Sequence, residues 1–282
     1  MDERSGPVTI RTMTRPEVDL AVEWAAREGW NPGAHDAEPF YRADPQGFFA
    51  AVDGEEIVGT ASLVRYPGGL CFAGFLIVRP DRRGEGIGSR LIHHLLRKGE
   101  GCTIGGDGVP EMVPTYQRYG FLPAYWNHRF EGTGGGEMPL EVMPLAELEW
   151  DEVARFDTSA FSTPRERFLK SFLGQEGTVA LGVRGEDGLE AYGAIRPCRR
   201  GHKIGPLFAT GPEAAALVHR GLVSTVPGQP YYLDVPSPNL EAMKLVRSLG
   251  LREVFRTARI YIGTPPPVPV DRVYGVTSFE LG

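Results

Sequence analysis

The feature that most restricts the fold is a strand-to-helix junction in the first half of the chain. The apolar run LCFAGFLIV at residues 70–78 predicts a buried strand, and SRLIHHLLRKG at 89–99 predicts an amphipathic helix. Between them, RRGEGIG at 82–88 places three glycines at alternate positions. A helix that begins near Gly86 exposes its first N–H groups and the positive end of its dipole. Because glycines leave those groups accessible to a bulky anion and allow positive φ, the junction suits a phosphate group.

Two common phosphate-binding motifs do not fit this junction. No Lys-Ser or Lys-Thr pair follows the glycines, so the turn is not a P-loop. The dinucleotide fingerprint needs GxGxxG after the first strand of a parallel unit, whereas here the spacing is GxGxG. The preceding strand also ends an antiparallel meander, which is predicted from apolar runs at 47–54, 55–69 and 70–78 separated by turn dipeptides. From the glycines alone, a turn without any ligand is an open alternative.

The length and the glycine distribution predict two domains. A chain of 282 residues is about twice the usual domain length, and GTGGGEM at 132–138 is typical of a flexible connection. We therefore expect domains at residues 1–134 and 135–282. Each half alternates predicted helices and strands in a similar order, as in two degenerate copies of one fold. The expected class is α+β, with a mostly antiparallel central sheet flanked by helices in each domain.

The charge and the cysteine content limit the classes of binding partner and the cellular compartment that we expect. A net charge of −6 without a Lys/Arg block argues against a nucleic acid or an anionic membrane as partner. Three widely spaced cysteines without a CxxC pair fit a reducing compartment. Without an apolar signal core or a run of about 18 apolar residues, the expected location is cytoplasmic. No Cys/His spacing indicates a metal site, so a small molecule is the expected partner.

The residues around the glycines resemble a known family. VRPDRRGEGIG at 78–88 resembles the signature loop of the GNAT superfamily of acyl-CoA-dependent N-acyltransferases, which follows that family's fourth strand. YQRYGF at 116–121 is similar to the family's Tyr-x-x-x-Gly-Phe motif. The order of predicted elements across residues 8–131 also agrees with the family fold. The residues that match the loop pattern are Val78, Pro80, Arg83, Gly84, Gly86, Ile87 and Gly88.

The resemblance implies an N-acetyltransferase that uses acetyl-CoA as co-substrate, without a metal. In that family the loop amides bind the coenzyme A pyrophosphate, and the backbone of the preceding strand holds the pantetheine arm. Tyr116 is implied as the acid that protonates the departing thiolate, because a phenol with a pKa of about 10 can donate to a thiolate of about 8.5. Core packing is the alternative for this side chain. The coenzyme-binding residues implied are Ile77, Val78, Arg83, Gly84, Glu85, Gly86, Ile87, Gly88 and Ser89.

The sequence determines the acceptor side less well. An alkyl ammonium has a pKa of about 10.4 in water, so a group must take its proton before the amine attacks. Asp107 is one candidate, and Glu28, His35 and Asp36 lie in the segment that lines the acceptor side in this family. A water chain is an equal alternative, a helix cap is an alternative for Asp36, and core packing is one for Trp30. The residues expected at the acceptor are Trp30, Asn31, Asp36 and Asp107.

The second half lacks both chemical parts of the first. Its strand-to-helix junction, GPLFATGPEAAALV at 205–218, has no alternating glycines. Pro212 has no N–H to offer, and Glu213 would place a negative charge where a pyrophosphate would lie. Val246 stands at the position that corresponds to the tyrosine. We therefore expect the second domain to shape the acceptor site and not to bind coenzyme A.

The function expected from these residues is transfer of an acetyl group from acetyl-CoA to a primary amine of a small molecule by direct attack. One alternative is a non-catalytic sensor that binds acyl-CoA without turning it over. Another is acetylation of protein amino groups, since an acidic chain would suit a basic tail.

Overall fold

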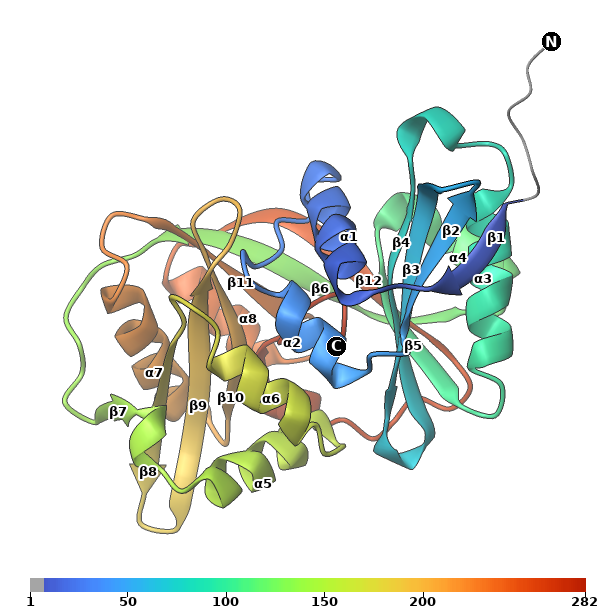
Figure 1. The fold of residues 1–282 in the computed structure, drawn as a ribbon. Coiled ribbons are helices and arrows are strands. Elements are labelled where there is room, and N and C mark those ends of the chain that lie inside the picture. The colour runs from blue at the N-terminus through green and yellow to red at the C-terminus, as the bar shows by residue number, and fades with distance from the viewer. Residues whose placement is uncertain (1–7) are drawn as a thin grey trace.

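Strands supply the framework of both halves in the computed structural model, which describes residues 8–282 (Figure 1). In the first half they are β1 (Thr9–Thr12), β2 (Phe48–Asp53), β3 (Glu56–Tyr66), β4 (Leu70–Val78), β5 (Thr103–Gly108) and β6 (Leu122–Thr133). In the second half they are β7 (Val142–Pro144), β8 (Val179–Gly185), β9 (Gly188–Pro197), β10 (His202–Ala209), β11 (Pro230–Pro236), β12 (Arg252–Ile262) and β13 (Val273–Gly275).

These strands form one continuous sheet of 13 strands. The order along it is β1-β2-β3-β4-β5-β12-β6-β11-β10-β9-β8-β7, and β13 pairs with β10 off this path. Neighbouring strands are antiparallel, except that β4 runs parallel to β5 and β10 runs parallel to β11. The expected α+β class with mostly antiparallel sheets is confirmed, and the sheets of the two halves are joined edge to edge.

Helices pack on both sides of this sheet, and local sequence explains their ends. The helix α1 begins after Thr14, whose N–H donates to the Glu17 carboxylate at 2.7 Å in a capping box. It ends before Gly29, which adopts φ +81°. The helices of the described chain are α1 (Arg15–Arg27), α2 (Ala37–Ala43), α3 (Ile87–Lys98), α4 (Val113–Arg118), α5 (Trp150–Phe161), α6 (Glu166–Leu173), α7 (Pro212–Ser224) and α8 (Leu240–Ser248).

Alternation along β2 produces two separate cores on the two faces of the first half. Phe48 and Ala50 are buried with α1 and α2, whereas Phe49 and Ala51 are buried with α3. This is the period of two that a strand imposes on its side chains. The core on the α1 side also receives α6 from the second half, where Phe168 and its neighbour Phe172 stack on Phe40 of α2.

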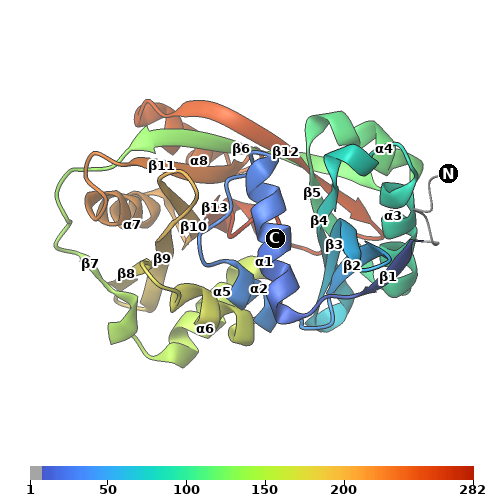
Figure 2. The same cartoon turned by 45° about the horizontal axis from the view of Figure 1, so that its top comes forward.

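The two halves exchange strands at the centre of the molecule. β12 lies between β5 and β6, and β6 in turn pairs with β11 along Asn127–Thr133. Figure 2 shows β6 and β12 running from one half into the other. The strand β6 therefore pairs with two strands of the second half. Each half thus contributes a strand to the sheet of the other, and neither half forms its complete sheet alone.

The C-terminal segment is part of the core. After the three residues of β13, residues 276–282 carry no further strand, but all of them are buried. The last residues are therefore held in the interior of the fold although they form little regular structure. Figure 1 places the C-terminus between the two halves, beside α2.

Candidate active site

The parallel strands β4 and β5 pair along only part of their length. Their register runs from Leu70 opposite Thr103 to Ala73 opposite Gly106, and the remaining residues of β4 have no partner on β5. On the other side of β4, Phe75 and Leu76 lie opposite the single residue Ala61 of β3, which is a bulge. Phe75 adopts φ +49° there. The bulge and the separation of the strands open the sheet at this point.

A cavity of about 70 Å³ lies at this opening. Its walls are residues of β4, α3 and β5, together with Tyr116 and Phe121. The second half closes it with Phe255, Thr257 and Ile260 of β12 and with Phe279 and Glu280 of the C-terminal segment. Most of these side chains are apolar, which lowers the local dielectric constant. A polar group in the wall therefore interacts more strongly with a bound molecule than it would in water.

The glycine turn presents a row of free amides beside the unpaired end of β4. Gly84 and Gly86 adopt φ +89° and +78°, and α3 begins directly after Gly86. Within residues 8–282, the six consecutive N–H groups from Gly84 to Ser89 donate to no other group. An anion with several oxygens could accept hydrogen bonds from this row and would lie at the positive end of the α3 dipole.

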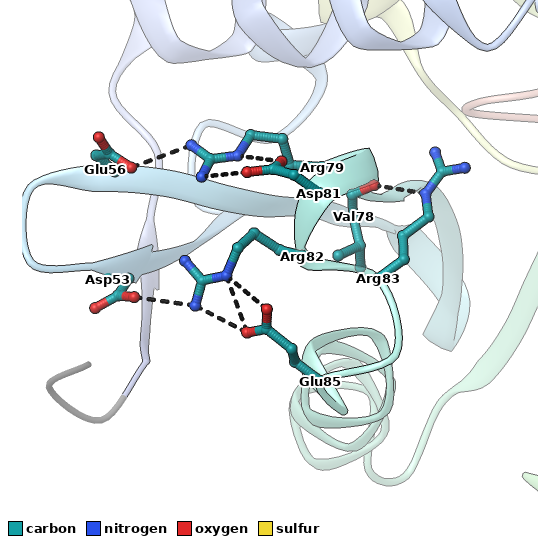
Figure 3. Close-up of polar contacts among 8 residues, drawn as sticks. All are labelled: Asp53, Glu56, Val78, Arg79, Asp81, Arg82, Arg83 and Glu85. Carbon is teal, nitrogen blue, oxygen red and sulfur yellow. Dashed lines mark hydrogen bonds and ion pairs between the residues drawn. The ribbon is translucent and has the colours of Figure 1, made fainter. Parts of the chain in front are cut away.

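The arginines before the turn are engaged in holding its shape (Figure 3). Arg79 pairs with Asp81 at 2.7 Å and with Glu56 at 3.2 Å. Arg82 pairs with Asp53 at 3.0 Å and with Glu85 at 2.9 Å. The carboxylate of Glu85 thus faces Arg82, and what this residue offers an anion is its backbone N–H.

Arg83 points away from those two arginines (Figure 3). It donates to the carbonyl of Val78 at 3.0 Å and pairs with Glu28 of the first loop. Its side chain is 49% exposed, so it is the arginine of the three that solvent reaches most readily. Glu28, a sequence candidate for the proton acceptor, is therefore a partner of Arg83 at the turn.

Tyr116 lies on the cavity from the short helix α4. Its ring packs edge-on against Phe121 with 6.0 Å between ring centroids. A Cβ on Gly108 would come within 2.8 Å of the ring, so glycine at this position makes room for it. Burial raises the pKa of Tyr116 to about 12, and the phenol therefore holds its proton at neutral pH.

The two expected acceptor residues of the first loop have different positions. Trp30 lies on the cavity, and its carbonyl accepts a hydrogen bond from Arg129 at 2.6 Å. Asn31 adopts φ +52° and is not part of the cavity wall. Its amide side chain binds the backbone of Arg200, accepting from N–H at 2.9 Å and donating to the carbonyl at 3.3 Å. Asn31 therefore fastens this loop to the second half.

The two expected aspartates are both buried in ion pairs with the second half. Asp36 binds Arg196 at 2.8 and 3.1 Å and does not reach the cavity. Asp107 does line the cavity, but Arg259 binds both of its oxygens at 3.1 and 2.7 Å, and Asn127 donates to it at 2.7 Å. The remaining sequence candidate, His35, is exposed and lies outside the cavity wall.

Sequence reasoning missed the contribution of the C-terminal segment and of β12. Phe279 and Glu280 line the cavity although they follow Tyr116 by more than half of the chain. No local motif marks them. The signal that could have been used is the apolar character of SFEL at 278–281, which predicts burial but not the place where the segment is buried.

The corresponding opening of the second half is filled by the chain itself. β10 and β11 pair only from His202 to Ile204, and beyond that point β13 lies between them and pairs with β10. The N–H of Val276 donates to the carbonyl of Asp234 in β11 at 2.8 Å. The helix α7 that follows begins at Pro212. The place of an opening at β10 is therefore taken by protein backbone.

Comparison with known proteins agrees with this geometry. Residues 16–121 match the family described as "Acetyltransferase (GNAT) family", and residues 153–275 match the "Acetyltransferase (GNAT) domain". The chain belongs to the GNAT acyltransferase family. Both halves of this GNAT protein are therefore members of one family, as the repeated order of elements predicted, and proteins of the family use acyl-CoA.

Relatives of this GNAT protein extend over its whole length. The holothin acyltransferase of Pseudoalteromonas sp. is 29% identical over 277 residues, which are 97% of this chain and 94% of the relative. A putative acetyltransferase from Pyrococcus horikoshii superposes with a TM-score of 0.84 at 22% identity, covering 100% of this chain and 99% of that one. A tandem GNAT protein from the clavulanic acid pathway superposes with a TM-score of 0.63 at 14% identity, covering 92% and 100%. The two structures are evidence for the fold alone.

Two features are absent from the described part of this GNAT protein. Among residues 8–282, no helix has the length and the apolar character needed to cross a bilayer. The same residues contain no group of three or more His, Cys, Asp or Glu side chains arranged to hold a metal ion.

Proposed function

We propose that this protein is an N-acetyltransferase that moves the acetyl group of acetyl-CoA to a primary amine of a small molecule by direct attack. Residues 1–134 would carry the coenzyme site and Tyr116, and residues 135–282 would shape the acceptor site. The observation that supports this proposal most is the row of six free amides beside a cavity that also holds a buried phenol.

The coenzyme site follows from the backbone. The amides from Gly84 to Ser89 would bind the pyrophosphate, whose charge is favoured at the start of α3. Ile77 and Val78 lie beyond the part of β4 that pairs with β5, so this edge of β4 is open to the pantetheine arm. The Val78 carbonyl accepts a hydrogen bond from the Arg83 side chain there. Since β13 fills the matching opening at β10, one coenzyme molecule per chain is expected.

Tyr116 is the proposed acid. Its proton is held because burial raises its pKa, while a departing thiolate with a pKa of about 8.5 is a strong enough base to take it. Among residues 8–282, Tyr116 is the one tyrosine in the wall of the cavity. Its place on α4 next to the cavity agrees with that role.

A small acceptor fits the walls of the cavity better than a protein chain. The second half adds Phe255 and Phe279 to the cavity wall, so the acceptor would meet an apolar pocket shaped by both halves. The relative named holothin acyltransferase has holothin as its acceptor by name, and it aligns over nearly the whole of this chain. Acetylation of protein amino groups is therefore the less favoured alternative.

The test is a titration followed by a rate measurement on the full chain. Acetyl-CoA should bind with one site per chain in isothermal titration, and thiol release should follow when alkyl amines, sugar amines, amino acids, polyamines or anilines are added. A peptide with lysines would test the protein acceptor. Binding without thiol release for every amine would make the chain an acyl-CoA-binding sensor, and no binding at all would refute the proposal.

A further inference from the structure

The C-terminal segment brings a buried carboxylate to the cavity that holds Tyr116. Glu280 is 3% exposed and forms part of the cavity wall. We propose that Glu280 accepts the proton of the acceptor ammonium, so that the first half of the chain supplies the acid and the last residues of the second half supply the base. This inference rests on the proposed function and names the residue that completes its chemistry.

Glu280 is held in place by hydrogen bonds of its neighbours. The hydroxyl of Tyr66 in β3 donates to the carbonyl of Leu281 at 2.9 Å. The Leu281 N–H donates to the Ser278 hydroxyl at 3.1 Å, and the Gly282 N–H donates to the Ser278 carbonyl at 3.1 Å. Before Glu280, Phe279 packs under the guanidinium of Arg129 with 4.8 Å to the ring centroid. The segment is therefore a fixed turn, as a positioned catalytic group requires.

Close backbone contact with β4 also places Glu280 beside the bulge. A Cβ added to Gly74 would lie 2.4 Å from the carbonyl oxygen of Glu280, so the segment can approach this closely only because the residue is glycine. Gly74 immediately precedes Phe75, where β4 bulges at the cavity. The backbone of Glu280 and the strand expected to hold the thioester are thus in direct contact.

The carboxylate of Glu280 forms no direct ion pair among the described residues, whereas Asp107, the other acidic residue of the cavity wall, does. Asp107 has both oxygens bound by Arg259 and accepts a further hydrogen bond from Asn127. Taking a proton would require Asp107 to give up a buried ion pair, which is costly. Among residues 8–282, no other residue donates a hydrogen bond to the Glu280 carboxylate or forms a direct ion pair with it.

The charges around Glu280 adjust its proton affinity. Burial raises the pKa of its carboxyl, Asp36 of the loop before α2 adds to this, and Lys203 of β10 and Arg129 of β6 act in the opposite direction. Burial also lowers the pKa of Lys203, to about 8. A carboxyl with a raised pKa is closer to the pH at which a general base works best. Asp107 and Tyr116 also belong to the wall of the cavity.

The proton and electron movements then balance. The acceptor ammonium gives one proton to Glu280, and the freed electron pair of the nitrogen forms the C–N bond with the thioester carbon. The C–S bond breaks, and the sulfur takes its bonding pair and the proton of Tyr116. The nitrogen, now part of the amide, returns its second proton to the Tyr116 phenolate. Glu280 releases its proton to water when the product has left.

The experiment measures kcat/KM of the full-length wild type and of full-length Glu280→Gln from pH 5 to pH 9. In Glu280→Gln, kcat/KM for alkyl amines should fall about 100-fold or more, the usual contribution of a general base. The loss should be much smaller for aniline, which is already neutral at pH 7 and has no ammonium proton to lose before it attacks. The acid limb that Glu280 gives the wild-type profile should disappear, and the alkyl-amine rate of the variant should instead rise with pH as the fraction of neutral amine rises. The acetyl-CoA affinity from isothermal titration should not change.

Two variants separate this role from a structural one. Glu241→Gln, on the exposed face of α8, removes a glutamate that lies far from the cavity and should behave as wild type. Glu280→Asp keeps a carboxylate and should restore part of the rate together with the acid limb. Wild-type rates in Glu280→Gln, or equal losses for aniline and alkyl amines, would overturn the assignment of Glu280 alone. A wild-type protein that binds acetyl-CoA but releases thiol with no amine would overturn the proposed function itself.

Discussion

At the scale of single residues, Tyr116 makes the clearest prediction. Tyr116→Phe should lower kcat about 10- to 100-fold, because the thiolate must leave without a donated proton, and should leave the acetyl-CoA affinity within about twofold. Tyr231→Phe is a matched control, since burial likewise raises the pKa of Tyr231 to about 12 but its hydroxyl faces His219 in the second half. Single-turnover rates would check this, and an unchanged chemical step in Tyr116→Phe would exclude the phenol as the acid.

Gly86 tests the coenzyme turn at the same scale. An alanine at position 86 would have to adopt the φ of +78° that Gly86 has, which costs about 1–2 kcal/mol of unfolding free energy. Space is not the obstacle, because nothing lies within 4 Å of an added Cβ. Gly86→Ala should therefore melt earlier and also bind acetyl-CoA more weakly, because relaxation of φ moves the neighbouring amides. Gly228 has φ +72° and equal space, but lies in the second half. Gly228→Ala should show the same loss of stability with unchanged affinity, and equal losses of affinity in both variants would refute the role of the turn.

At the scale of elements, the C-terminal segment depends on a close approach to β10. A Cβ on Gly205 would lie 2.4 Å from the carbonyl oxygen of Val276 and 2.7 Å from that of Thr277. Gly205→Ala should thus displace the segment that carries Glu280 and cost about 1–3 kcal/mol of unfolding free energy. In the wild-type background it should also lower kcat. In a Glu280→Gln background, Gly205→Ala should lower kcat no further. An additive loss in this double-mutant cycle would show that the segment does not act through Glu280.

The elements also explain how far the sequence could predict the site. The glycine turn and Tyr116 were predictable because each lies in a short motif between a strand and a helix whose residues are neighbours along the chain. Asp107 was noticed, but its partner Arg259 is 152 positions away and reaches it only because β12 inserts beside β5. The periodicity of β12 predicts a strand without naming its neighbour, since pairing depends on contacts distant in sequence. For the same reason Glu280 had no signal of its own.

At the scale of the whole molecule, the exchange of β6 and β12 makes the two halves a single folding unit. Without β12 the edge of β5 would lose its partner, and without β6 the edge of β11 would lose its partner. Glu280 at the cavity is a consequence of the same arrangement, because the chain that follows β12 runs back between the halves. The second half, whose own opening is filled by β13, therefore contributes residues of β12 and of the C-terminal segment to the cavity wall.

The buried ion pair between Asp36 and Arg196 carries the last prediction, because it joins the first half to β9 of the second. Both side chains are at most 1% exposed, and the Arg196 guanidinium also lies 4.4 Å from the Phe172 ring centroid. Asp36→Asn leaves that guanidinium buried without its counter-charge, which should cost about 3–5 kcal/mol of unfolding free energy at pH 7. Glu241→Gln, which breaks an exposed pair with Lys244, should cost less than about 1 kcal/mol.

The unfolding free energy lost in Asp36→Asn should depend on pH in one direction. Burial opposes the charge of Asp36, but Arg196 outweighs it, and the pKa of the carboxyl lies below its ordinary value. The contribution of the pair is therefore complete above the unfolded pKa of about 3.9 and is lost as pH falls through the lower folded pKa. Urea unfolding of wild type and Asp36→Asn should differ most near pH 7 and converge in strong acid. If Asp36→Asn instead raised the KM for the amine without loss of stability, Asp36 would belong to the acceptor site and not to the joint between the halves.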